Sequence, residues 1–148
     1  MKTYGLPFFS LLVLAAVMTL ACGSPRKIVN NCGPVAPSNS TGSLESVTLC
    51  PPVADAQQYP GGQVSFAAIG VYTTQPSPAL ISTGVMWGAC QGEAATNDVS
   101  VANGVAKCAS GASGTYTVWG TGTASVICNV IGPCGACGPT GTAQLTCP

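Results

Sequence analysis

The stretch from residue 98 to residue 108, DVSVANGVAKC, contains two short runs in which apolar and polar side chains alternate. Between the runs lies Asn103-Gly104, a pair that favours a two-residue turn with both residues at positive φ. A hairpin closed at this turn pairs Ala102 with Val105, Val101 with Ala106, Ser100 with Lys107 and Val99 with Cys108. A shift by one residue would turn Lys107 toward the apolar face, so the pattern predicts this register.

The same period of two recurs in segments 43–50, 61–74, 83–90, 113–122 and 141–148. Each is predicted to be a half-buried strand. The inward side chains are expected to be Val47, Leu49, Val64, Phe66, Ala68, Tyr72, Val85, Trp87, Ala89, Tyr116, Val118, Ala143 and Leu145. The Pro-rich segment 73–82 is predicted to be a loop, and no segment after residue 21 has a helical period. The pattern therefore predicts an antiparallel β-sandwich or barrel.

The beginning of the chain has the features of an export signal. Met1-Lys2 is a short basic start, and residues 6–21 are almost continuously apolar. The apolar run is short for a membrane span and ends in small residues. Residues 1–21 are therefore predicted to be a signal peptide that is removed.

Cys22 follows this signal directly. Leu20, Ala21 and Cys22 resemble the last three positions of the lipobox of bacterial lipoproteins. Thr19 departs from that pattern, which has Leu, Val or Ile three residues before the cysteine, and ordinary cleavage with a free Cys22 is the alternative. The resemblance implies that Cys22 is acylated and anchors the protein in the cell envelope, at the outer membrane or facing the periplasm. Without the lipid, the protein would be secreted.

The chain contains nine cysteines, and removing Cys22 from this count leaves an even set of eight. An exported chain with an even set is expected to form disulfides. The candidates are Cys32, Cys50, Cys90, Cys108, Cys128, Cys134, Cys137 and Cys147. Expected pairs are Cys90 with Cys108 and one pair within Cys128, Cys134 and Cys137.

Cys134 and Cys137 also have the C-x-x-C spacing of thiol-disulfide oxidoreductases. Gly and Pro residues flank this pair on both sides, and they prevent the helix that would stabilise a reactive thiolate. Structural disulfides are favoured for these cysteines, and a redox function is the weaker alternative.

Composition limits the function further. The four acidic residues after position 21 are scattered, the three basic ones form no patch, and the chain has no histidine. Nucleic acid is excluded as a partner, because its binding requires clustered Lys and Arg. No catalytic pair, metal site or cofactor site is evident, so a non-enzymatic protein is predicted. Residues 22–43, rich in Pro, Gly and Ser, are expected to form a flexible tether, and residues 44–148 one folded domain.

The order of several residues in segment 44–148 resembles bacterial immunoglobulin-like domains of group 2, known as BIG2. These residues are Gly62, Phe66, Gly70, Tyr72, Trp87, Gly111, Gly114, Tyr116 and Val118. The resemblance implies an immunoglobulin-like β-sandwich that serves as a structural, recognition or adhesion module, with an unknown protein or polysaccharide as ligand. A secreted carbohydrate-binding module is the alternative.

Three aromatic residues receive specific predictions. Trp87 is expected to be the large central ring between the sheets. Tyr116 stands two residues before Val118, where antibody domains have a tyrosine two residues before a core cysteine. Trp119 is expected to face outward, either available to a sugar or covered by residues 128–137.

Overall fold

A computed structural model of the chain describes residues 32–33, 35–37, 40–122, 134 and 136–148. The predicted signal peptide, Cys22 and Cys128 lie outside these residues. The strands are β1 (Leu44–Cys50), β2 (Val53–Asp55), β3 (Gln63–Ser65), β4 (Ala67–Tyr72), β5 (Ala79–Leu80), β6 (Val85–Gln91), β7 (Ala94–Ala95), β8 (Val99–Ala102), β9 (Val105–Cys108), β10 (Gly114–Gly122) and β11 (Thr140–Cys147). Two 3-10 turns, Ala56–Gln58 and Pro60–Gly62, lie between β2 and β3. Within the described residues, no helix has the length and apolar character needed to cross a membrane.

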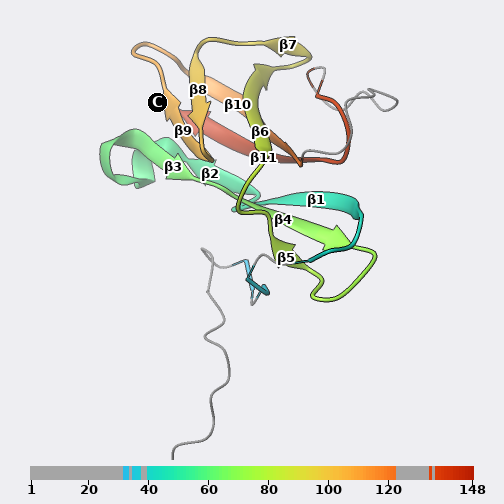
Figure 1. Cartoon of the computed structure of the whole chain (residues 1–148). Coiled ribbons are helices and arrows are strands. Elements are labelled where there is room, and N and C mark those ends of the chain that lie inside the picture. The colour runs from blue at the N-terminus through green and yellow to red at the C-terminus, as the bar shows by residue number, and fades with distance from the viewer. Residues whose placement is uncertain (1–31, 34, 38–39, 123–133, 135) are drawn as a thin grey trace, which may run out of the picture.

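The strands form two layers (Figure 1). One layer is a five-stranded sheet in the order β2-β11-β10-β6-β7. The other consists of two three-stranded sheets, β1-β4-β5 and β3-β9-β8, which are joined because only Phe66 separates β3 from β4. The order β1, β3–β4, β9, β8 corresponds to strands A, B, E and D of an immunoglobulin domain, and β6, β10, β11 to C, F and G. The predicted immunoglobulin-like antiparallel β-sandwich is confirmed.

The chain crosses from one layer to the other at Pro51-Pro52. β1 pairs with β4 on one side of this step, and β2 pairs in parallel with β11 on the other. Proline has no N–H to donate to a strand ladder, so two consecutive prolines end β1. The Pro52 carbonyl still accepts a hydrogen bond of 2.9 Å from the Gln144 N–H, which attaches the crossing to β11.

The hairpin predicted at residues 98–108 forms in the expected register. All four predicted pairs occur between β8 and β9, from Val99–Cys108 to Ala102–Val105. Asn103 and Gly104 have φ of 50° and 79°, as a turn of this type requires. Val99 and Ala106 are buried while Lys107 is exposed, so burial of one face explains the register.

One hydrophobic cluster fills the space between the layers. Its largest fully buried side chains include Tyr116, Leu49, Leu145, Val64 and Val118. Trp87 is only partly buried and packs against this cluster, so the prediction of a central ring holds in part. Its benzene edge lies between the layers, because a Cβ on Gly120 would come within 2.9 Å of the ring and one on Gly104 within 3.2 Å.

Tyr116 forms the tyrosine corner of an immunoglobulin domain. Its side chain is 2% exposed, and its hydroxyl donates to the Ser113 carbonyl at 3.2 Å. The same hydroxyl lies 3.2 Å from a carboxylate oxygen of Asp98, which precedes β8. Tyr116 therefore connects the start of β10 to the loop that enters the hairpin.

Burial of the ring, and then the hydrogen bond and negative charge of Asp98, raise the pKa of Tyr116 above its ordinary value. The folded protein therefore keeps this proton at a pH where the unfolded chain, with a tyrosine pKa near 10, has lost it.

We expect the contribution of Tyr116 to stability to be complete below about pH 10 and to be lost as the pH rises from there through the folded-state pKa. Denaturant midpoints measured from pH 8 to 12 should show this fall. Tyr116→Phe should be less stable at pH 8 but show a smaller fall, and an identical fall in both proteins would contradict the assignment.

Three disulfides are described: Cys32–Cys50, Cys90–Cys134 and Cys108–Cys147, with Cα–Cα distances of 5.9, 6.0 and 5.9 Å. The predicted Cys90–Cys108 pair is wrong. Ala89 points into the core, so its neighbour Cys90 points to the outer face of the five-stranded sheet, away from β9. Cys134 bonds to Cys90 and so forms no pair with Cys128 or Cys137.

Cys137 is also disulfide-bonded. Of the pairs expected within Cys128, Cys134 and Cys137, only Cys128 with Cys137 is left as a prediction. Cys128 lies outside the described residues.

Part of the predicted tether packs against the domain. The Cys32–Cys50 disulfide attaches it to the end of β1, and Val35 is buried in a small cluster with Cys50 and Ile69. Ala36 extends the edge at β5, where its N–H donates to Pro78 at 3.2 Å and its carbonyl accepts from Leu80 at 3.1 Å. The described part of segment 22–43 is thus fixed to the sandwich at several points.

Candidate functional site

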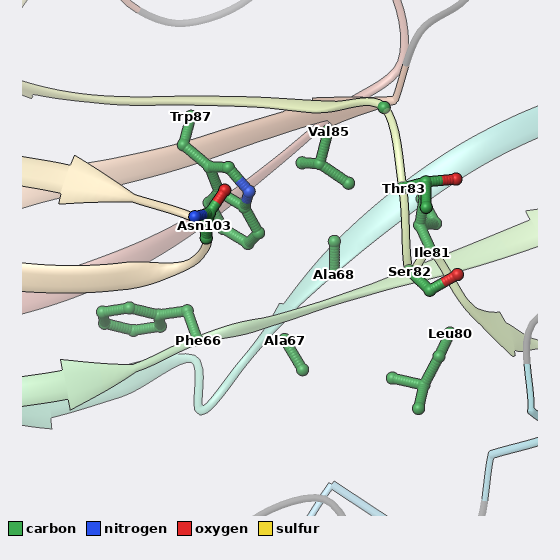
Figure 2. Close-up of a pocket in the computed structure, with 11 residues that line it drawn as sticks. Phe66, Ala67, Ala68, Leu80, Ile81, Ser82, Thr83, Val85, Trp87 and Asn103 are labelled. Atoms are coloured by element: carbon green, nitrogen blue, oxygen red, sulfur yellow. The ribbon is translucent and has the colours of Figure 1, made fainter.

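A groove of about 530 Å³ opens between the connection from β5 to β6 and the turn between β8 and β9. Its volume lies within the range of small-ligand sites. Figure 2 shows Trp87, Asn103 and Phe66 at one end and Ile81, Ser82 and Thr83 at the other. Its remaining lining residues are Ala67, Ala68, Leu80, Gly84 and Val85.

The groove lies where the second layer is incomplete. β9 pairs with β3 only as far as Ser65, and β5 pairs with β4 only at Ile69 and Gly70. Between these positions, the Phe66 N–H donates to Gly104 at 2.7 Å, and the Ala68 carbonyl accepts from Ile81 at 2.9 Å. β1 pairs with Ala67 and Ala68 on one side. On the other side of residues 66–68, no described strand continues from β9 to β5, and the groove opens at this gap beside the two connections.

Trp87 forms the main aromatic wall. Its inner edge is held against Gly104 and Gly120, and the ring remains partly exposed to the groove. Its indole N–H makes no hydrogen bond to any described residue. Every buried side-chain nitrogen or oxygen among these residues does have a hydrogen-bond partner, so the indole nitrogen is not one of the buried atoms. The indole N–H is therefore accessible and can donate to a ligand.

Asn103 and Thr83 contribute further polar groups from opposite sides. Both residues are exposed, and neither side chain makes a hydrogen bond within the described part of the protein. An amide both donates and accepts, and so does a hydroxyl. Of the described residues that line the groove, none carries a charge. The site therefore offers one aromatic surface, together with neutral polar side chains that make no hydrogen bond within the described part of the protein.

A second hollow of about 300 Å³ lies beside the Cys108–Cys147 disulfide. Its lining is mostly small, with Gly61, Gly62, Ala109, Gly111 and Ala112 among its members. It lacks an aromatic platform among the described residues, and Ser110 contributes its one side-chain hydroxyl. We therefore consider the first groove as the candidate site.

The three described disulfides brace the fold. Cys134 is bonded to Cys90, whose side chain has 0% exposure, so the C-x-x-C pair is not closed as an oxidoreductase disulfide. Across the described residues, no cluster of three or more His, Cys, Asp or Glu side chains could hold a metal ion.

Trp119 lies on the outer face of the five-stranded sheet, as predicted, and is half-buried. Its ring lies against Gly88, where a Cβ would collide with the indole. The alternative of a cover from residues 128–137 falls mostly outside the described residues.

The sequence alone does not mark Asn103 or Thr83 as candidate site residues. Asn103 was explained by the turn that it forms, and Thr83 begins a predicted strand next to a Pro-rich loop. The signal that could have found them is their joint position at two connections that flank Trp87, and the pairing of the strands is needed to see it.

A comparison of the chain with protein-family models and with curated proteins finds no match.

Proposed function

We propose that this protein is a non-enzymatic, lipid-anchored recognition module of the bacterial cell envelope. The observation that carries the proposal is a preformed neutral groove on a sandwich that disulfides hold together. Disulfides of this kind belong to an oxidising compartment outside the cytoplasm. A rigid scaffold with ligand contacts on its connecting loops is a common arrangement for binding.

The anchor is proposed from the resemblance of residues 20–22 to a lipobox. Cys32 follows Cys22 by ten positions, and Cys32 is bonded to β1. Ten residues span at most about 35 Å when fully extended. An acylated Cys22 would therefore hold the domain close to the membrane surface, within reach of envelope polymers rather than of distant partners.

Cys22→Ser should release the protein from the membrane fraction. More than one acyl chain makes an anchor effectively stable, because each buried CH₂ contributes about 0.8 kcal/mol. The measurement is the partition of the exported protein between membrane and soluble fractions, with Ser24→Ala as a matched control close to the same site. Membrane partition that is unchanged in Cys22→Ser would refute the anchor at Cys22, and a parent protein found only in the soluble fraction would favour the secreted form.

The second candidate is a secreted carbohydrate-binding module. The observation that favours it is the exposed edge of Trp87 beside neutral hydrogen-bonding groups, and it requires that Cys22 carry no lipid. A thiol-disulfide oxidoreductase using Cys134 and Cys137 is disfavoured, because Cys134 is bonded to a buried partner.

A further inference from the structure

We propose that the groove beside Trp87 binds an uncharged saccharide chain, with Trp87, Asn103 and Thr83 as its contact residues. This inference rests on the proposed recognition function and names the class of ligand. Three observations carry it: the absence of charge in the described lining, the accessible indole, and the polar groups that have no internal partner.

The absence of charged residues in the described lining disfavours ionic ligands. A carboxylate, phosphate or ammonium group is normally recognised by an opposite charge or a bidentate hydrogen bond. The described lining contains neither Lys nor Arg, and neither Asp nor Glu. An ionic ligand would lose its hydration without a countercharge, whereas a neutral ligand avoids this cost.

The polar groups match hydroxyl chemistry. A sugar hydroxyl both donates and accepts, like the Asn103 amide and the Thr83 hydroxyl. The Trp87 indole adds a donor next to an apolar ring, against which the C–H face of a pyranose can pack. None of these three side chains gives up a hydrogen bond within the described protein when a ligand binds.

A polyproline peptide is the competing neutral ligand, because such segments bind grooves lined by aromatic residues. Those grooves use several exposed rings. Here Phe66 is only 6% exposed, so Trp87 is the one accessible aromatic ring among the described lining residues. The groove therefore favours a saccharide over a polyproline helix.

The test uses the fluorescence of Trp87 in the mature chain. The whole sequence contains two tryptophans, so Trp119→Phe leaves Trp87 as the single reporter. This protein is titrated with laminarihexaose, cellohexaose, maltohexaose and N-acetylchitohexaose. An anionic oligogalacturonate and a decaproline peptide are the comparators. We expect saturable binding of at least one neutral hexasaccharide, with no binding of the two comparators.

Asn103→Gly removes the amide but keeps a residue that accepts positive φ, so the hairpin turn is preserved. We expect this variant and Thr83→Ala each to weaken binding by about three- to tenfold, the loss of one or two hydrogen bonds. Asn97→Gly is the matched control, because Asn97 is exposed and lies outside the groove. Its affinity should equal that of the parent protein.

The outcomes separate this inference from the proposed function. Binding of none of the four neutral sugars, binding of decaproline alone, or sugar binding unaffected by both groove variants would overturn the saccharide groove. Each of these results leaves a recognition function intact. If a hexasaccharide binds in the groove and is cleaved to shorter products, the ligand assignment stands and the non-enzymatic function fails.

Discussion

Replacing Cys108 and Cys147 together by alanine should lower the free energy of unfolding by about 4 kcal/mol. The bond joins β9 in one layer to β11 in the other, across 39 residues of sequence. In the chain-entropy model, a cross-link of this length strongly restricts the unfolded chain. It is also the described disulfide that connects the two layers directly. The core disulfide usual in antibody domains is missing, because Val118 occupies the position of its cysteine in β10.

The control is the Cys32→Ala/Cys50→Ala double variant, whose loop spans 18 residues. The same model predicts a loss of about 3 kcal/mol for this shorter loop. Double substitutions are used so that no unpaired thiol remains to exchange with other disulfides. Denaturant unfolding of the oxidised proteins measures both values. A loss below about 1 kcal/mol for the Cys108 and Cys147 variant would show that the two layers do not depend on this bond.

Replacing Trp87 by alanine should cost about 3 kcal/mol, at the lower end of the range for a large aromatic side chain. The inner edge of the ring contacts Gly104 and Gly120, which lie in opposite layers, and its removal would leave a void beside Leu49. The loss stays below that of a fully buried ring, because the other side of Trp87 already faces the groove.

Trp119→Ala is the matched control for this substitution. Trp119 lies on the outer face of the sheet against Gly88, so its removal leaves no void between the layers. We expect a loss of about 1 kcal/mol, because apolar contact is lost only on the outer face of the sheet. Chemical denaturation of both variants gives the comparison. The account of the core would be wrong if Trp119→Ala were the more damaging change or if Trp87→Ala had almost no effect.

The strands with clear alternation were predictable because local pattern and tertiary burial agree in them. The β8–β9 hairpin is the best case, since its turn residues and its apolar face both fix the register. The inward positions of Tyr116, Val118, Ala143 and Leu145 also follow the predicted period, and all four are buried.

The shorter strands were not predictable from the sequence. β2, β5 and β7 contain three, two and two residues, too few to show a period. Segment 61–74 reads as one strand, yet it divides at Phe66 because its two halves have different neighbours.

Disulfide partners depend on the same tertiary information. The sequence analysis predicts a bond between Cys90 and Cys108 that would join the Trp87 strand to the hairpin. The side chain of Cys90 instead projects from the outer face of β6 and bonds to Cys134. The groove could not be predicted from the sequence for a related reason. It opens at the gap between the β3–β9 and β4–β5 pairings, and no single segment of the sequence shows which strands will pair.

The most direct test of the central claim, recognition without catalysis, combines binding with analysis of the ligand. The full exported protein would be incubated with neutral polysaccharide isolated from the envelope of the producing cells. Bound protein and polysaccharide chain length would then be measured over time. We expect saturable binding that weakens in Asn103→Gly and a chain-length distribution that does not change. Progressive shortening of the polysaccharide, abolished by a single substitution in the protein, would contradict it.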